Sequence, residues 1–363
     1  MLIRRSGFVA RVIAWTALIV VVLGTGALAQ RSRPITIQEA IRMALANDLS
    51  AQVAKLAYEV AQVNYQKNMA SNLLTDSALN ALTAEASLRN AQIAYENQQG
   101  SVILSTVSTF FDVLANEITV DIRRAQLRVA EINLEGTLRR ANLGTASQLD
   151  VLDAQASAET SRLSLQSAES SLRQSKENLA ASLGLASPDE VVLDPNIPVP
   201  SADFSLEEGI AAALQRDASI LSARTDLEVA RIDLERALAE GVAPLDLRLA
   251  QIAVQREELE LQQALRSSRN SVISAYQSVM TAADNLRVQT SRLEAAERRH
   301  EVIMQQYAAG LRTETEKISA EVTLAQAKLD HLNTLASYVR AVLSYRHLIE
   351  GPDTSGAIDG AQD

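Results

Sequence analysis

The sequence predicts an all-α protein built from two tandem repeats of long antiparallel coiled-coil helical hairpins. Three observations support this prediction. First, the 363 residues are 47% apolar but only 3% aromatic, a composition typical of long helices and unlike the aromatic-girdled strands of a membrane β-barrel. Second, the seven prolines all lie outside the periodic stretches. Third, the two halves of the chain carry the same pattern of residues.

The first 29 residues predict a signal peptide. A basic stretch ends at Arg11, an apolar run covers 12–23, and a small-residue cleavage site lies at 27–29. An uncleaved anchor is the alternative, although the run is short for a spanning helix. Because an exported chain without cysteine suits a bacterial periplasm, we expect the protein to be exported to the periplasm.

The prolines between 188 and 200 predict an extended linker that divides the remaining chain into two nearly equal halves. We therefore expect a first helical repeat over 30–184, a Pro-rich linker over 185–203, a second repeat over 204–350 and a disordered acidic tail over 351–363. Each repeat is predicted to be a slender bundle about 100 Å tall. The expected helices cover 37–47, 50–72, 76–142, 147–184, 206–216, 219–240, 244–308 and 313–350.

The two halves align, and the aligned segments carry the same helix-start signals. ITIQEAIRMAL at 35–45 matches FSLEEGIAAAL at 204–214, and each copy opens with the sequence of a capping box. RRANLGTASQLDVLDAQ at 139–155 matches QQYAAGLRTETEKISAE at 305–321. Each of these contains a glycine, Gly144 or Gly310, that can end a helix in the left-handed conformation. Heptad seams run over 151–179, after the first turn, and over 272–307, before the second.

The composition also excludes several classes of function. The chain has no cysteine, three histidines and a formal net charge of −10, which argues against a metal centre, a disulfide framework and nucleic-acid binding. No catalytic triad, phosphate loop or dinucleotide fingerprint is present. We therefore expect no enzymatic activity, no cofactor and no metal.

These motifs resemble the TolC-like outer membrane factors (outer membrane efflux proteins) of efflux pumps and type I secretion. LGTASQLDVLDAQ at 143–155 carries the most specific part of the resemblance, together with the duplicated openings and the AAGLRTETEK turn. The resemblance implies a homotrimer that associates with the outer membrane and forms an α-helical tunnel through the periplasm. It also implies partners: a periplasmic adaptor (membrane fusion) protein that grips the tunnel tip, and an inner-membrane transporter.

The chain departs from this family between the medium and long helices of each repeat, where the family inserts two β-strands. Neither residues 68–81 nor residues 238–249 offers one strand of about 9–11 residues with an alternating pattern, let alone two. We therefore expect tight helical turns there, and a TolC-like tunnel domain without the β-barrel. Direct membrane insertion does not follow from this sequence.

Two interpretations remain for the acidic residues beyond the tip glycines. Asp150 and Asp153 lie one turn apart, and the resemblance implies that they line a constricted tip. It also places Tyr307, Arg312 and Glu316 on the family's other gating positions. The alternative is that Asp150 and Glu316 simply cap the helices that follow.

Three functional hypotheses follow. The chain is a component of a tripartite efflux pump or type I secretion system, or a periplasmic scaffold or spacer without conduction of its own, or an exit duct whose pore another protein supplies. A trimer with a water-filled bore favours the first and third, whereas a solid dimeric coiled coil favours the second.

Overall fold

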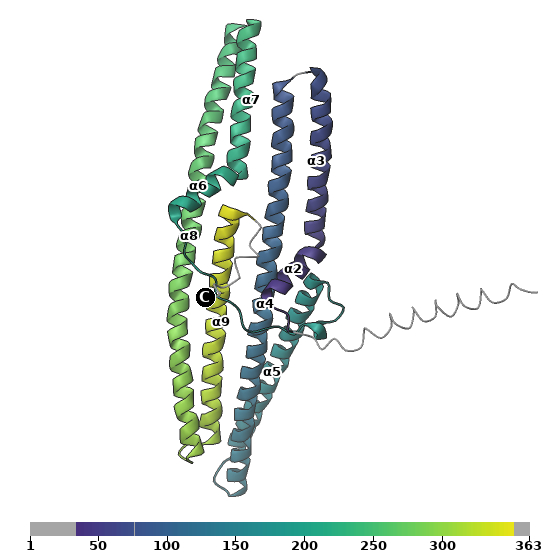
Figure 1. Cartoon of the computed structure of the whole chain (residues 1–363). Helices are drawn as coiled ribbons and strands as arrows, with labels where there is room; N and C mark the ends of the chain where they lie inside the picture. The colour runs from purple at the N-terminus through teal and green to yellow at the C-terminus, as the bar shows by residue number, and fades with distance from the viewer. Residues whose placement is uncertain (1–33, 76, 352–363) are drawn as a thin grey trace, which may run out of the picture.

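In the computed structural model, which describes residues 34–75 and 77–351, every regular element of the described part is helical (Figure 1). The predicted signal peptide at 1–29 and all of the predicted acidic tail except Gly351 lie outside these residues. The elements in chain order are α2 (Ile37–Asn47), α3 (Leu49–Thr75), α4 (Ala78–Asn142), α5 (Gln148–Leu183), the 3-10 turn η1 (Pro188–Glu190), α6 (Leu206–Arg216), α7 (Ala218–Glu240), α8 (Pro244–Ala308) and α9 (Glu314–Glu350).

The all-α prediction is confirmed, and the predicted helix bounds agree with the structure to within three residues. The two long helices α4 and α8 each have 65 residues, a length of about 100 Å. α3 and α5 lie end to end along α4, and α7 and α9 lie end to end along α8. Among the described residues of 68–81 and 238–249 there is no strand, only a short break before α4 and before α8.

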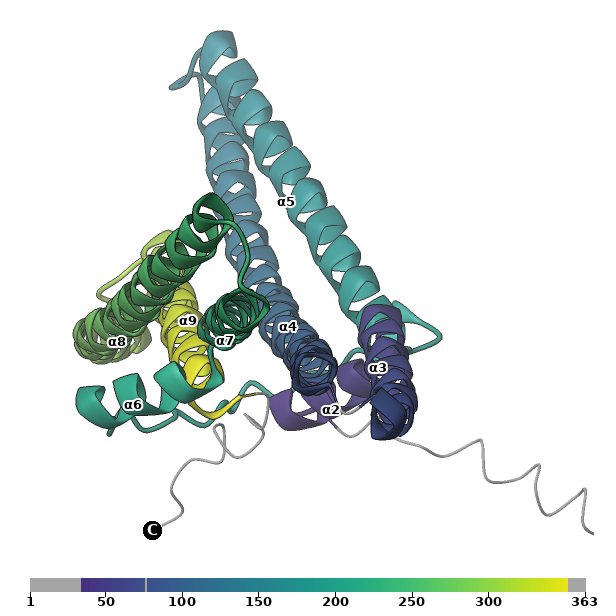
Figure 2. The same ribbon diagram turned by 90° about the horizontal axis from the view of Figure 1, so that it is seen from above.

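The long and medium helices form a single layer, and the short helices α2 and α6 cross it at a level that we call the waist (Figures 1 and 2). α4 packs against both α5 and α9, and α9 packs against α8, which gives the order α5–α4–α9–α8 in the half below the waist (Figure 1). Above the waist the contacts run α3–α4–α7–α8, and Figure 2 shows this row end-on. The molecule is therefore an open wall with two free edges, one formed by α3 and α5 and the other by α8.

The two halves are not separate bundles, in contrast to the expectation that each half stands alone. α4 carries apolar side chains on two faces, so it packs on α9 of the second half as well as on α3 and α5 of its own. Arg128 of α4 also bonds Glu314 of α9 at 2.6 Å, and Arg340 of α9 bonds Ser108 of α4 at 3.4 Å. The shared contact makes one structure of the two repeats.

The hydrophobic core lies at the waist, where the short helices and the linker meet the long ones. Phe110 of α4, Leu179 of α5 and Val339 of α9 are fully buried in one cluster. The linker joins this core: Val191, Leu193 and Ile197 are buried, and the linker pairs with Ile35, whose amide donates to the Val192 carbonyl at 2.7 Å. The Pro-rich linker thus packs across the waist and contains one 3-10 turn.

One helix among the described residues, α4, is long and apolar enough to cross a bilayer by length and composition, and 44% of its most apolar window is buried inside the protein. The apolar stretch coincides with the waist core around Val107 and Phe110. Burial of this kind is what a core helix between two neighbours requires.

Candidate functional site

The first hairpin tip joins α4 to α5 through a glycine turn. Gly144 has φ 73°, the left-handed conformation that a residue without Cβ adopts at little cost. The Thr145 amide then donates to the Arg140 carbonyl at 2.8 Å, which satisfies an acceptor left open at the end of α4. The predicted turn at Gly144 is thereby confirmed.

Asp150 caps the helix that follows this turn. Its Oδ2 accepts from the Ser147 amide at 2.7 Å, and its own amide donates to the Ser147 hydroxyl at 3.2 Å. Both halves of a capping box are present. These bonds from the Ser147 backbone and side chain lower the pKa of Asp150 below its ordinary value, with a small contribution from the charge of Arg140. Asp153 is exposed one turn further along α5.

The second tip joins α8 to α9 and has a denser network. Gly310 takes φ 75°, and Thr313 and Glu316 form a capping box in which Glu316 Oε2 accepts from the Thr313 amide at 2.8 Å. Arg312 bridges the turn: its Nη1 bonds Glu316 Oε1 at 2.7 Å and its Nε bonds the Gln306 side chain at 2.9 Å. The Thr313 amide, Arg312 and the Thr313 hydroxyl, in that order, lower the pKa of Glu316 to about 2.

The structure therefore brings Arg312 and Glu316 together and places Tyr307 beside them. Lys317 Nζ lies 5.2 Å from the centre of the Tyr307 ring, a cation–π distance. Sequence reasoning missed Gln306 and Lys317 as parts of this tip. Lys317 follows Glu316 directly, but no spacing rule predicts a cation over a ring on the opposite side of a turn.

The two tips lie at different levels within one chain. Arg128, which bonds the first residue of α9, lies 15 residues before Leu143 at the end of α4, so the first hairpin extends well past the second. Figure 1 shows the α4–α5 end projecting beyond the α8–α9 end. Asp150 and Asp153 are consequently not in the network of Arg312 and Glu316, and the structure leaves the gating hypothesis a prediction.

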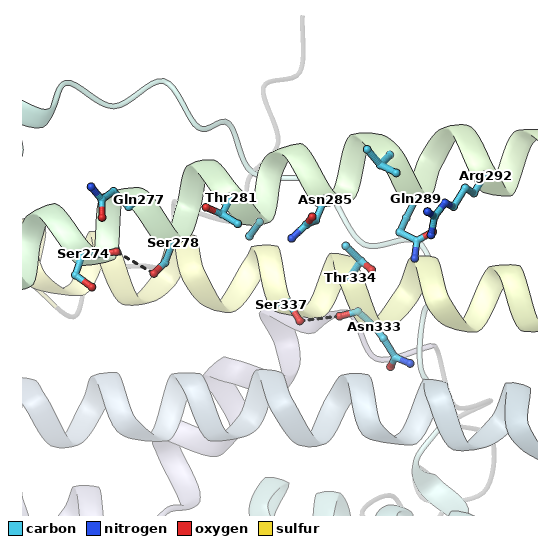
Figure 3. Close-up of a pocket in the computed structure, with 12 residues that line it drawn as sticks. Ser274, Gln277, Ser278, Thr281, Asn285, Gln289, Arg292, Asn333, Thr334 and Ser337 are labelled. Carbon is cyan, nitrogen blue, oxygen red and sulfur yellow. Dashed lines mark hydrogen bonds between the residues drawn. The ribbon is translucent and has the colours of Figure 1, made fainter.

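A polar groove of about 720 Å³ runs between α8 and α9 below the waist (Figure 3). Polar side chains, most of them uncharged, recur at heptad spacing along the α8 side of the groove. α9 contributes three more polar side chains. The lining includes one formal charge, on Arg292. The labelled lining residues are Ser274, Gln277, Ser278, Thr281, Asn285, Gln289, Arg292, Asn333, Thr334 and Ser337.

The two free edges of the wall expose apolar stripes above the waist. Five residues of α3 are 59–75% exposed although they are large and apolar, and they follow one another at spacings of 4, 3, 4 and 3. They are Leu49, Val53, Leu56, Val60 and Val63. α8 exposes a second stripe at the opposite edge, formed by Leu245, Leu249, Ile252 and Leu259. Apolar residues at heptad spacing are typical of a seam that packs against another helix.

Comparison with known proteins agrees with this architecture. A family model described as outer membrane efflux protein matches residues 73–185, which include the whole α4–α5 hairpin. The chain is 31% identical over 166 residues to the outer membrane protein TolC of Vibrio cholerae, a match that covers 46% of this chain and 38% of TolC. The chain spans less than half the length of the curated relatives it matches.

Solved structures share the fold over most of the chain. A membrane protein from Pseudomonas aeruginosa superposes with a TM-score of 0.60 at 14% identity, covering 87% of this chain and 90% of that one. The outer membrane protein VceC of Vibrio cholerae gives 0.58 at 15% identity, covering 87% and 96%. The resemblance found in the sequence is confirmed: residues 73–185 match the outer membrane efflux protein family, and the chain shares the helical fold of these solved structures, with no strand inserted between its described medium and long helices.

Proposed function

We propose that several copies of this chain form a helical periplasmic conduit in an efflux pump or type I secretion system. In this proposal the chain is exported, associates with the outer membrane and closes into a homotrimer. Its hairpin tips dock a periplasmic adaptor protein and face an inner-membrane transporter. The matched efflux family and the channel neighbours support this role.

The observation that carries the proposal is the open wall with two unlike apolar edges. An isolated layer of helices leaves the stripes on α3 and α8 in water, and burying such residues stabilises a protein by about 25 cal/mol per Å² of apolar surface. The stripes lie on opposite edges, so one chain cannot cover its own. In the assembly, the α8 stripe of one copy packs on the α3 stripe of the next. The row of helices then forms a closed ring around a central space.

The α4–α7 contact within one chain gives the expected register of such a junction. Asn90 of α4 bonds Ser222 of α7 at 3.5 Å. Their equivalents in the two repeats are Arg256 of α8 and Val53 of α3. A copy that continues the wall in the same register therefore places Leu56 of α3 beside Ile252 of α8, because the two helices run antiparallel.

The chain offers a clean crosslinking test because it contains no cysteine. We expect the double variant Leu56→Cys/Ile252→Cys, oxidised in the native cell envelope, to give a ladder of products that ends at three chains. Each single variant is the matched control and yields no ladder, since only one edge then carries a thiol. Recovery of the double variant as an uncrosslinked monomer overturns the conduit proposal.

The tips supply a second test, directed at the gating hypothesis. In a closed ring the Asp150 and Asp153 carboxylates of all copies meet around one axis, and acidic rings favour cations in pores. We expect Asp150→Ala/Asp153→Ala to change the cation selectivity and conductance of the reconstituted conduit, or its leakage of substrate. Asp150→Asn/Asp153→Ala separates capping from charge, because the Asn side-chain oxygen can still accept from the Ser147 amide. Unchanged conductance and leakage exclude the gate.

A further inference from the structure

His347 lies at the waist, where the end of α9 meets α4 of the other repeat. Its ring lies directly against Gly100: a Cβ built at that position would lie 2.5 Å from the ring atom Cε1. Nε2 of the ring lies 3.2 Å from the Asn97 side-chain oxygen. Only a glycine lets the imidazole approach the α4 backbone this closely. The position of the ring therefore depends on Gly100 of α4 as well as on His347 of α9.

An ion pair between the repeats shares this site. Arg216, the last residue of α6, bonds Glu96 of α4 at 2.7 Å, and both side chains line a cavity of about 240 Å³ together with His347. The guanidinium of Arg216 also lies against Gly351, the residue that ends α9. Within the described part of the chain, Nδ1 of His347 is buried and no group meets hydrogen-bond geometry to it, although the Gly351 backbone lies nearby. The carboxylate of Glu96 therefore lies close to both the Arg216 guanidinium and the His347 imidazole.

The remaining groups around the ring are accounted for element by element. Asp217, at the start of α7, uses its Oδ1 to accept from the Ser219 and Ile220 amides. α8 contributes the uncharged Ser268 and Ser271, and α9 itself carries Arg346 and Glu350 beside the histidine. Glu96 is thus the carboxylate on α4 that faces both Arg216 and the ring.

Burial, followed by the charge of Arg216, lowers the pKa of His347 below 6.5, while Glu96 and a backbone bond at Gly351 act in the opposite direction. A histidine with a lowered pKa in the folded state stabilises that state fully above about pH 6.5. This stabilisation is lost as the pH falls from 6.5 through the lowered value.

We propose that His347 is a pH-responsive latch between the two repeats. The neutral ring sits on Gly100 and leaves Glu96 to Arg216, which holds the α6–α7 corner and the end of α9 on α4. The protonated ring places a second positive charge in the same cavity, competes with Arg216 for Glu96 and loosens this contact. The latch sets how firmly the two hairpins are joined at the waist. This role does not depend on whether the assembled protein conducts a substrate.

Hydrogen–deuterium exchange of the full chain at pH 8 and pH 5, corrected for the intrinsic effect of pH, tests the latch. We expect segments 93–100, 213–220 and 345–351 to lose protection at pH 5 relative to pH 8 in the wild type. In His347→Gln, whose side chain remains a hydrogen-bonding group without a titrating charge, we expect equal protection at both pH values. His331→Gln, which alters a histidine bonded to Thr290, should behave as the wild type.

Arg216→Gln provides the second variant and reverses the sign. Without the arginine, a protonated His347 is free to pair with Glu96, so protection at 93–100 and 345–351 should rise at pH 5. The proposal is wrong if His347→Gln keeps the wild-type response to pH, or if Arg216→Gln loses protection at pH 5 as the wild type does.

Discussion

α4 and α8 occupy equivalent positions in the two repeats, but they meet different surroundings. Both have 65 residues and align without a gap at an offset of 166. On one shared face both are apolar and fully buried, as at Val113 and Val279. On another face α4 buries Leu114, which is 5% exposed, where α8 presents Met280 at 44%.

The difference follows from position in the wall. α4 lies between two helices on every level, whereas α8 forms the edge. Where α4 has buried Ile103 and Phe111, α8 carries Arg269 and Gln277. A duplicated sequence thus keeps the length and the inner seam of a helix, while the outer face adapts to whatever covers it.

The largest expected effect is at the matched pair Leu114 and Met280. Leu114→Ala should lower the free energy of unfolding by about 2–4 kcal/mol, since it empties a buried site. Met280→Ala should lower it by less than about 0.5 kcal/mol. Urea denaturation of each variant in dilute solution measures both losses. Equal losses would mean that α8 is covered on both sides and that the comparison between centre and edge does not hold.

Glycines in α4 give the next largest effect. A Cβ at position 136 meets nothing within 4 Å, so Gly136→Ala should raise the free energy of unfolding by about 1 kcal/mol through helix propensity. Gly100→Ala gains the same propensity but displaces the His347 ring, and we expect a net loss of about 1–2 kcal/mol. Urea denaturation of both variants compares the signs, and a stabilising Gly100→Ala would show that the ring moves freely.

The smallest effect concerns the two tips in acid. The lowered pKa of Glu316, about 2 against an ordinary 4.5, means that its cap stabilises the second tip fully above about pH 4.5 and that this stabilisation is lost as the pH falls through about 2. The amide NMR shift of Thr313 should follow that titration. In Glu316→Gln the shift should stay constant, while Ser147 at the first tip still titrates with Asp150. A Thr313 titration that persists in the variant would contradict the assignment.

Much of the fold could be predicted from the sequence, because helix ends depend on local chemistry. Gly144 and Gly310 with the caps Ser147 and Thr313 mark both turns within one residue. The opening at Ser205 was predicted to be a full capping box, but only the Glu208 amide bonds the Ser205 hydroxyl. The prediction from residue types is right about where this helix starts and wrong about the reciprocal bond.

The lateral packing could not be predicted in the same way. Whether the repeats stand apart or share a wall depends on contacts such as Arg128 with Glu314 and Arg216 with Glu96, which join residues more than a hundred positions apart. Tip residues were found from the turn motif, but their partners Gln306 and Lys317 depend on side-chain directions that no periodicity encodes. Nothing in the sequence pattern singles out His347, because Gly100, against which its ring packs, lies 247 residues earlier in the chain.

The unlike edges of the wall also decide what kinds of assembly are possible. A surface that is its own complement would pair two copies and stop, but an α3 edge that fits an α8 edge can only continue head to tail. The rotation that relates one copy to the next then determines whether the assembly closes into a ring and how many copies the ring contains. Small changes in the angle at which α4 crosses α9 would therefore change the number of copies in the ring, or turn the closed ring into an open helical filament.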